Sequence, residues 1–177
     1  MIKNEKIYKL FRITLLFSLL ISISCLNMAT NLPTTKTDIA KIRSIEHSDM
    51  KVIVHTDAND YSISADRYAR GATKDFISDC FYNDKYASIK YETRNKEIVD
   101  LYYAKKDFVS AVSPSNEDTN VLSIALQKRP TLVYLNKSDV SYEYIIGLLN
   151  ESLTKKIEII LAINPVTRNI EYAMMDK

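Results

Sequence analysis

Apolar residues alternate with polar ones, or recur at helical spacing, along most of the chain after residue 48. Met50–Thr56 is rich in β-branched residues and predicts a strand, and the alternating Tyr86–Thr93 predicts a hairpin with Glu97–Ala104. Between these strands we expect a helix from Ser64, which can cap it, to about Phe81. The core side of this helix would be formed by Ala65, Tyr68, Ala69, Ala72, Phe76 and Cys80.

The last third of the chain repeats these patterns with other residues. Thr131–Leu135 predicts a strand, and Val140–Thr154 predicts a helix. The nearly continuous apolar run Ile157–Ile163 is typical of a central strand that is buried on both faces. Ile170–Met175 alternates and is expected to return beside it.

Strand, helix, strand and strand thus occur twice, at about 50–104 and 131–175, although no residue identity links the two stretches. Asp107–Val112 is expected to add a strand, and Val121–Lys128 fits either a short helix or a strand. These elements predict an α+β fold, a mixed sheet with two helices packed on one face. The sequence leaves open whether this fold consists of two strand–helix–strand–strand units.

The N-terminal segment has the layout of a secretory signal. An uncharged apolar run, Ile13–Leu26, follows a short basic region that contains Lys3, Lys6, Lys9 and Arg12. The run is shorter than the ~20 residues of a comfortable membrane span, although a minimal span with Arg12 reaching the interface stays open. The predicted organisation is a signal peptide or membrane anchor at 1–25, a polar tether at 26–48 and an extracytoplasmic α+β domain at 49–177.

Cys25 ends the stretch LLISISC, which resembles the signal of a bacterial lipoprotein. In such signals a small residue, here Ser24, precedes the cysteine that receives the lipid, whereas Ser22 stands where leucine is usual. The sequence leaves three outcomes open: lipid attachment at Cys25, simple cleavage, or an uncleaved anchor. All three place the domain outside the cytoplasm. A buried N-terminal helix of a cytosolic domain is the remaining alternative, and the charge layout disfavours it.

Composition narrows the possible partners and cofactors. Without residues 1–12, the Lys and Arg count falls from 24 to 20 and the Asp and Glu count from 22 to 21, so the remaining chain is nearly neutral. With no basic stripe, nucleic acid is not expected as a partner. The chain has only 2 Gly and no phosphate-binding Gly motif, and His47 and His55 lack metal-ligand spacing, so we expect no cofactor and no metal.

Two weak catalytic patterns are present. Cys80 and His55 could form a nucleophile pair with Asp57 or Asp60 as the orienting acid, as in a small cysteine hydrolase. The position of Cys80 on the apolar side of its helix favours a core thiol instead. Ser152–Lys155 has the S-x-x-K spacing of serine acyl-enzymes without the companion motifs, and a solvated helix end accounts for it better. We therefore expect no catalytic residues.

Candidate contact residues are aromatic. Tyr102, Tyr142 and Tyr144 are possible interface anchors, because exposed tyrosine is enriched at contact surfaces. A strand would place Tyr102 and its neighbour Tyr103 on opposite faces, so one of them should belong to the core. Asn136 and Asn150 fit the N-glycosylation pattern and would matter only in a eukaryotic secreted protein; Cys25 favours a bacterial one.

Arg129–Ile163 resembles the strand, polar turn, Tyr-containing helix and strand of the ExbD/TolR family, and Leu32-Pro33 follows the apolar run as in that family. These are small periplasmic partners of proton-driven envelope motors, so the resemblance implies one span and an anchored, dimerising α+β domain. The family carries an aspartate in its span, whereas Ile13–Leu26 contains no acid. A relative without that acid would lack a site for proton coupling.

Together these features predict a non-enzymatic, membrane-tethered envelope protein, lipid-anchored and facing the periplasm or the cell surface of a bacterium. Its domain is expected to bind another envelope or membrane protein, and a homodimer stays open. The alternatives are the ExbD/TolR-like anchored dimerisation domain and the cysteine hydrolase.

Overall fold

The computed structural model describes residues 34–176, and within them the fold is mainly β, with 48% strand and 22% helix. Residues 35–176 belong to one compact unit. Its first half contains β1 (Thr35–His47), β2 (Lys51–Thr56), β3 (Asp60–Ser64), α2 (Ala65–Ala69), α3 (Gly71–Tyr82), β4 (Tyr86–Glu92) and β5 (Ile98–Tyr103). Its second half contains β6 (Lys105–Asp107), β7 (Val109–Pro114), β8 (Val121–Leu126), β9 (Val133–Asn136), α4 (Tyr142–Lys155), β10 (Ile159–Ile163) and β11 (Ile170–Met175).

The first half is a five-stranded antiparallel sheet in the order β3-β2-β1-β4-β5. β1 lies at its centre: Thr35–Lys41 pairs with β4, and Ile42–His47 pairs with β2. The register shifts between Ile42 and Ser44, so β1 bends as it passes from one partner to the other. α3 packs against β1, and Ile77 and Cys80 of this helix are fully buried in the core.

Hydrogen bonds link β3 to the turn before β5, and α2 to the start of β5. The Ser62 backbone N–H donates to the Lys96 carbonyl over 3.0 Å, and Arg67 donates from its guanidinium to the carbonyls of Ile98 and Val99. These bonds use backbone groups that an open sheet edge would leave unpaired. These contacts cover part of both edges of the sheet.

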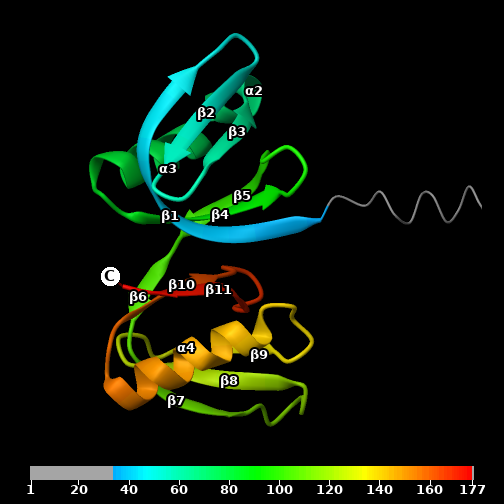
Figure 1. Ribbon diagram of the computed structural model, residues 1–177, viewed down its shortest axis with the longest axis vertical. Helices are drawn as coiled ribbons and strands as arrows, with labels where there is room; N and C mark the ends of the chain where they lie inside the picture. Colours follow the sequence, from blue (N-terminus) through cyan, green and yellow to red (C-terminus); the bar gives the residue numbers. More distant parts are fainter. Residues whose placement is uncertain (1–33, 177) are drawn as a thin grey trace, which may run out of the picture. The chain divides into compact units, whose positions relative to one another are not determined.

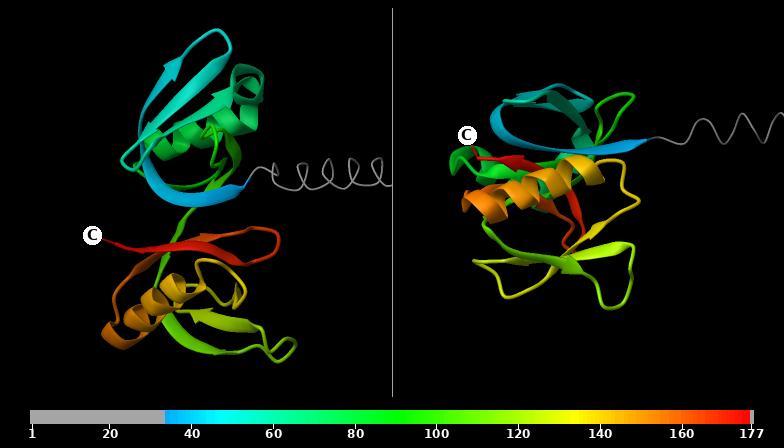
Figure 2. Two further views of the ribbon diagram at one scale, coloured as in Figure 1. Left: turned by 45° about the vertical axis from the view of Figure 1, so that its right-hand side comes forward. Right: turned by 60° about the horizontal axis from the view of Figure 1, so that its bottom comes forward.

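The second half contains two three-stranded antiparallel sheets, β11-β10-β6 and β7-β8-β9. α4 lies between the β10–β11 hairpin and the β7–β9 sheet (Figures 1 and 2). Ile145 and Leu149 of α4 are fully buried there, in the same cluster as Ile159 and Leu161 of β10. The Tyr134 backbone N–H donates to the Arg168 carbonyl over 3.0 Å, which joins β9 to the turn before β11.

The two halves meet through a small apolar cluster. Its buried members are Ile39 of β1, Tyr102 of β5, and Ile160 and Ala162 of β10. β10 is therefore buried on both faces, because Ile159 and Leu161 face the core of the second half. This agrees with the apolar run that predicted a central strand.

The α+β prediction is wrong. All pairings between the strands named here are antiparallel and fall into three sheets, so there is no mixed sheet with two helices on one face. The helix expected from Ser64 to Phe81 breaks at Arg70, whose backbone is extended, into α2 and α3. The two stretches also differ in strand order, so two strand–helix–strand–strand units are not formed. The ambiguous segment Val121–Lys128 supplies a strand rather than a helix.

Several individual elements are confirmed. The strands expected near residues 50, 86, 98, 131, 159 and 170 and the helix near 140–154 are all present. Ser64 does cap its helix, since its Oγ accepts the Arg67 N–H over 3.4 Å. The predicted tether at 26–48 needs correction over Thr35–His47, which is the central strand of the first sheet. The signal segment, Cys25 and Leu32-Pro33 lie outside the described residues.

Between residues 34 and 176, no helix is both long enough and apolar enough to cross a membrane.

Candidate functional site

Two hollows adjoin along the connection between β5 and β6, where the halves meet. The apolar hollow has a volume of about 270 Å³, and its walls include Val133, Ile163 and Pro165. The basic hollow has a volume of about 550 Å³, and its lining includes Lys41, Lys85 and Lys106. Both are lined by Tyr103, Lys105 and Arg129, so we treat them as one site, the junction groove.

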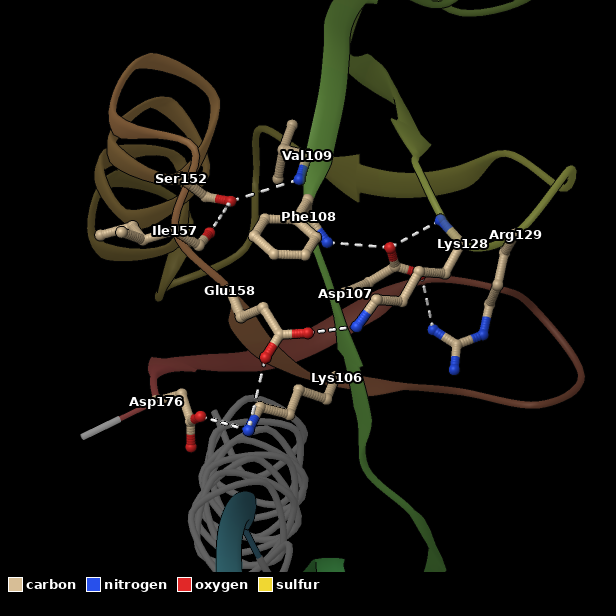
Figure 3. Close-up of polar contacts among 10 residues, drawn as sticks. All are labelled: Lys106, Asp107, Phe108, Val109, Lys128, Arg129, Ser152, Ile157, Glu158 and Asp176. Carbon is tan, nitrogen blue, oxygen red and sulfur yellow. Dashed lines mark hydrogen bonds and ion pairs between the residues drawn. The ribbon is translucent and has the colours of Figure 1, made fainter.

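Asp107 fixes the position of Arg129 in this groove (Figure 3). The Asp107 carboxylate is fully buried at the end of β6. Its Oδ1 accepts the backbone N–H groups of Phe108 and Lys128, each over 2.8 Å, and its Oδ2 accepts Arg129 Nη1 over 2.9 Å. One guanidinium nitrogen of Arg129 thus points at Asp107 while the others point away from it. Because a guanidinium has five N–H donors, Arg129 can still donate to a ligand.

Cations outnumber acids along the groove, but most of them have acidic partners. Lys41 pairs with Asp84, and Lys85 lies 2.8 Å from Asp79. Lys106 pairs with Glu158 and Asp176, as Figure 3 shows. Lys105 and Arg168 differ, because neither makes an ion pair within residues 34–176. The uncompensated positive charge of the groove therefore lies at these two side chains.

Tyr103 forms a wall shared by the two hollows. Lys85 and Lys105 lie 5.4 and 5.7 Å from the centre of its ring, within the range of cation–π attraction. Its hydroxyl donates to Asp79 over 2.6 Å, and this bond raises the pKa of Tyr103 to about 12. The ring is thus held from both its face and its hydroxyl end.

The turn between β10 and β11 places Arg168 at the apolar hollow. Asn164 organises this turn: its Oδ1 accepts the N–H groups of Val166 and Thr167 over 2.9 and 3.1 Å, and its carbonyl accepts the Arg168 N–H over 2.9 Å. Arg168 has φ 60°, a left-handed conformation that costs a non-glycine residue roughly 1 kcal/mol. The surrounding bonds hold the arginine there despite this cost.

Glu171 lies beside the groove and accepts hydrogen bonds from both halves of the unit. Thr37 and Tyr102 donate to its Oε2 over 2.9 and 2.7 Å, and Lys90 and Asn164 donate to its Oε1, each over 3.0 Å. Burial alone would raise the pKa of Glu171, but these four bonds lower it to about 2. Three of the donors belong to the first half of the unit, whereas Asn164 and Glu171 belong to the second. The carboxylate therefore links the two halves beside the apolar hollow.

The three predicted interface tyrosines have different environments. Tyr102 is only 8% exposed and donates to Glu171, so its contacts are internal. Tyr142 is half-buried against the core of the second half. Tyr144 is 51% exposed and packs against Tyr172, with 6.0 Å between the ring centres. Of the three, Tyr144 alone has the exposure of a contact residue.

The residues of the Cys80–His55 pattern lie in different environments. Cys80 is fully buried, and burial raises the pKa of its thiol to about 12. His55 Nδ1 lies 2.9 Å from Asp60, whose hydrogen bond raises the pKa of the imidazole. Asp57, the other orienting acid considered, accepts the Lys41 N–H over 2.9 Å. The structure therefore places Cys80 in the core and His55 in a separate contact with Asp60.

Ser152 is fully buried as well, and Figure 3 shows its hydrogen bonds to Val109 and Ile157. Its Oγ accepts the Val109 N–H over 3.2 Å and donates to the Ile157 carbonyl over 2.8 Å. These bonds fasten the end of α4 to β7, which gives the serine a structural role. Asn136 and Asn150 are exposed. No cluster of three or more potential metal ligands occurs between residues 34 and 176.

The junction groove could not be predicted from the sequence, because Lys105 begins the short strand β6 whereas Arg129 and Arg168 lie on two distant connections. No helical or strand periodicity links them, and each stands among other charged or polar residues. The available signal was local: Arg129-Pro130 and the polar turn NPVTRN each mark a connection at which a side chain can face a neighbouring strand.

No protein-family model, no curated protein and no solved structure matches this chain. The likeness of Arg129–Ile163 to the ExbD/TolR family therefore stays a resemblance.

Proposed function

We propose that this chain is a non-enzymatic, membrane-tethered protein of the bacterial envelope that binds a partner protein in the junction groove. The observation that carries the proposal is a pair of cations, Lys105 and Arg168, that make no ion pair within residues 34–176 and lie beside the apolar wall of the groove. Concave sites with apolar walls and a few convergent polar groups are typical binding sites.

The acids near the groove support binding rather than acid–base chemistry. Asp84 is paired with Lys41, and Asp79 accepts bonds from Lys85 and Tyr103 that lower its pKa to about 2. Both carboxylates are thus held ionised by their partners, whereas a general acid needs a proton to give near neutral pH.

The start of β1 supports a partner close to the membrane. Thr37 donates to Glu171, which also accepts Asn164 of the groove lining, so the chain enters the unit beside the groove. The segment between Cys25 and Thr35 can extend at most about 35 Å. If Cys25 carries lipid, the groove can reach other components near the membrane surface.

Photo-crosslinking in the producing bacterium tests this function. A crosslinking amino acid at Thr131, which is exposed and lines the apolar hollow, should give a discrete adduct with one envelope protein. Lys105→Glu together with Arg168→Glu should abolish that adduct, because both changes reverse the free positive charge. The matched control is the same crosslinker at Asn116, an exposed loop residue outside both hollows.

Identical adducts from Thr131 and Asn116, or no adduct from Thr131, would contradict a groove-specific partner. An adduct of this chain with itself would instead support the anchored dimer that the ExbD/TolR resemblance implies.

A further inference from the structure

The geometry points to a specific ligand class: we propose that the apolar hollow binds the free C-terminal carboxylate of a polypeptide whose last residue is apolar. This inference rests on the proposed function and names the part of the partner that is recognised.

The charges of the apolar hollow fit a carboxylate. Lys105, Arg129 and Arg168 all line it, and no acid of the described part of the chain does. Arg129 uses one nitrogen for Asp107, and the other two cations make no ion pair within residues 34–176. A carboxylate can accept several hydrogen bonds at once, and bonds between charged partners are the strong ones. The three cations can therefore share a single terminal carboxylate.

The walls of the same hollow fit one apolar side chain. Val133 is buried, Ile163 is half-buried, and Pro165 and the ring of Tyr103 complete an apolar surface. The volume of about 270 Å³ lies below the ~300 Å³ at which pockets for drug-sized ligands begin. The hollow thus has room for a single residue and its carboxylate rather than for a long segment.

The adjoining basic hollow favours a polypeptide over a free small acid. It continues from the same three residues, Tyr103, Lys105 and Arg129, and has about 550 Å³ for the residues that precede the C-terminus. Most of its own cations are already paired with acids, so this part of the ligand needs no negative charge. An anion recognised by charge alone, such as a phosphate, would leave the apolar wall without a partner.

Binding of two peptide pools to the full chain in detergent micelles tests the inference. The pools are octapeptides with random internal positions that end in Leu or Phe, one pool with a free carboxylate and the other amidated. We expect the free pool to bind at least tenfold more tightly, because loss of a charge-assisted contact has an effect of this size. Lys105→Glu and Arg168→Glu should each remove this preference.

The matched control is Lys74→Glu on α3, which reverses an exposed charge outside both hollows and should leave the preference unchanged. Thermal unfolding of each variant checks that the fold is retained. Equal binding of the two pools, or no binding of either, would overturn the inference. Displacement of the free pool by inorganic phosphate or by anionic phospholipid vesicles would also overturn it, since the site would then read charge alone.

The two proposals can fail separately. A groove-specific partner adduct at Thr131 without a preference for free carboxylates would leave the proposed function standing and refute the ligand class. A carboxylate preference without any partner adduct would support the ligand class and contradict the proposed function.

Discussion

At the scale of single residues, two carboxylates join distant parts of the chain: Asp107 is fully buried and Glu171 is half-buried. Glu171 and Asp107 are both carboxylates with several donors each, and both connect segments that are far apart in the sequence. A carboxylate that is partly or fully removed from water is costly unless hydrogen-bond donors fill its lone pairs, so both sites are sensitive to loss of a partner.

Glu171 should make the stability of the unit depend on pH. Its pKa lies near 2 in the folded state, below the ordinary 4.5, so its contribution is present above pH ~4.5 and is lost as the pH falls toward 2. We expect Glu171→Gln to lower the free energy of unfolding at pH 7 by about 2 kcal/mol and to flatten this acid-induced loss. Urea unfolding between pH 2 and 7 measures both effects.

Glu151→Gln is the control for this prediction, because Glu151 pairs with Lys155 on the surface of α4. It should change stability by ~0.5 kcal/mol or less. A Glu171→Gln variant as stable as the unaltered chain at pH 7 would show that the four donors do not stabilise the fold.

Cys80 should resist alkylation in the folded protein. Its side chain is fully buried and the pKa of the thiol is raised, so both access and thiolate formation are suppressed. Labelling with iodoacetamide should proceed only at the rate of unfolding and should speed up in denaturant. Rapid labelling under native conditions would reopen the cysteine hydrolase alternative.

At the scale of elements, strands with a regular apolar pattern were predictable and β1 was not. Ile159–Ile163 could be predicted because it is apolar throughout, and Tyr86–Glu92 because its apolar residues alternate. In β1 the neighbours Ile39 and Ala40 are both buried, Ile39 between the halves and Ala40 in the core of the first half. The shift in register after Ile42 then removes the remaining alternation. Such a strand has no period of two, and its threonines and lysines resemble a linker.

The groove could not be predicted from the sequence for a related reason. The three cations of its apolar hollow lie on one short strand, β6, and on two connections, and the tertiary structure alone brings these segments together. Secondary-structure patterns predicted where those connections begin and end, but they carry no information on which of them adjoin.

Two changes in β1 distinguish a central strand from a tether. Deletion of residues 35–47 should prevent folding, whereas loss of part of a tether would leave the domain intact. Ile39→Ala should lower the free energy of unfolding by about 2–4 kcal/mol, because it opens a cavity in the cluster between the halves. Circular dichroism and limited proteolysis show whether the deletion variant folds. Circular dichroism followed through unfolding gives the free energy of unfolding of Ile39→Ala. The control is Ser44→Ala, at an exposed position of the same strand, which should leave the free energy of unfolding nearly unchanged.

At the scale of the whole molecule, location depends on the segment ahead of the described unit. If Cys25 is the lipid attachment site, the mature chain should begin at Cys25 and carry the added mass of its acyl groups. Cys25→Ala should then release the protein from the membrane without altering the fold of residues 35–176. Intact-mass spectrometry of the membrane fraction measures this. A mature chain that starts elsewhere, or that carries no lipid, would contradict the lipoprotein prediction.

The position of β1 also has a mechanical consequence. If the chain is held at its N-terminus while a partner occupies the groove, any pull between them enters the unit at Thr35, along the axis of a strand paired with β4 from Thr35 to Lys41. Such a load is a shear, so the ladder bonds of this segment would have to break together rather than one at a time. Part of the load would pass from Thr37 through Glu171 to Asn164 in the groove lining, close to the point where it enters the unit. Most of the unit would therefore carry little tension, and the groove could keep its shape under strain.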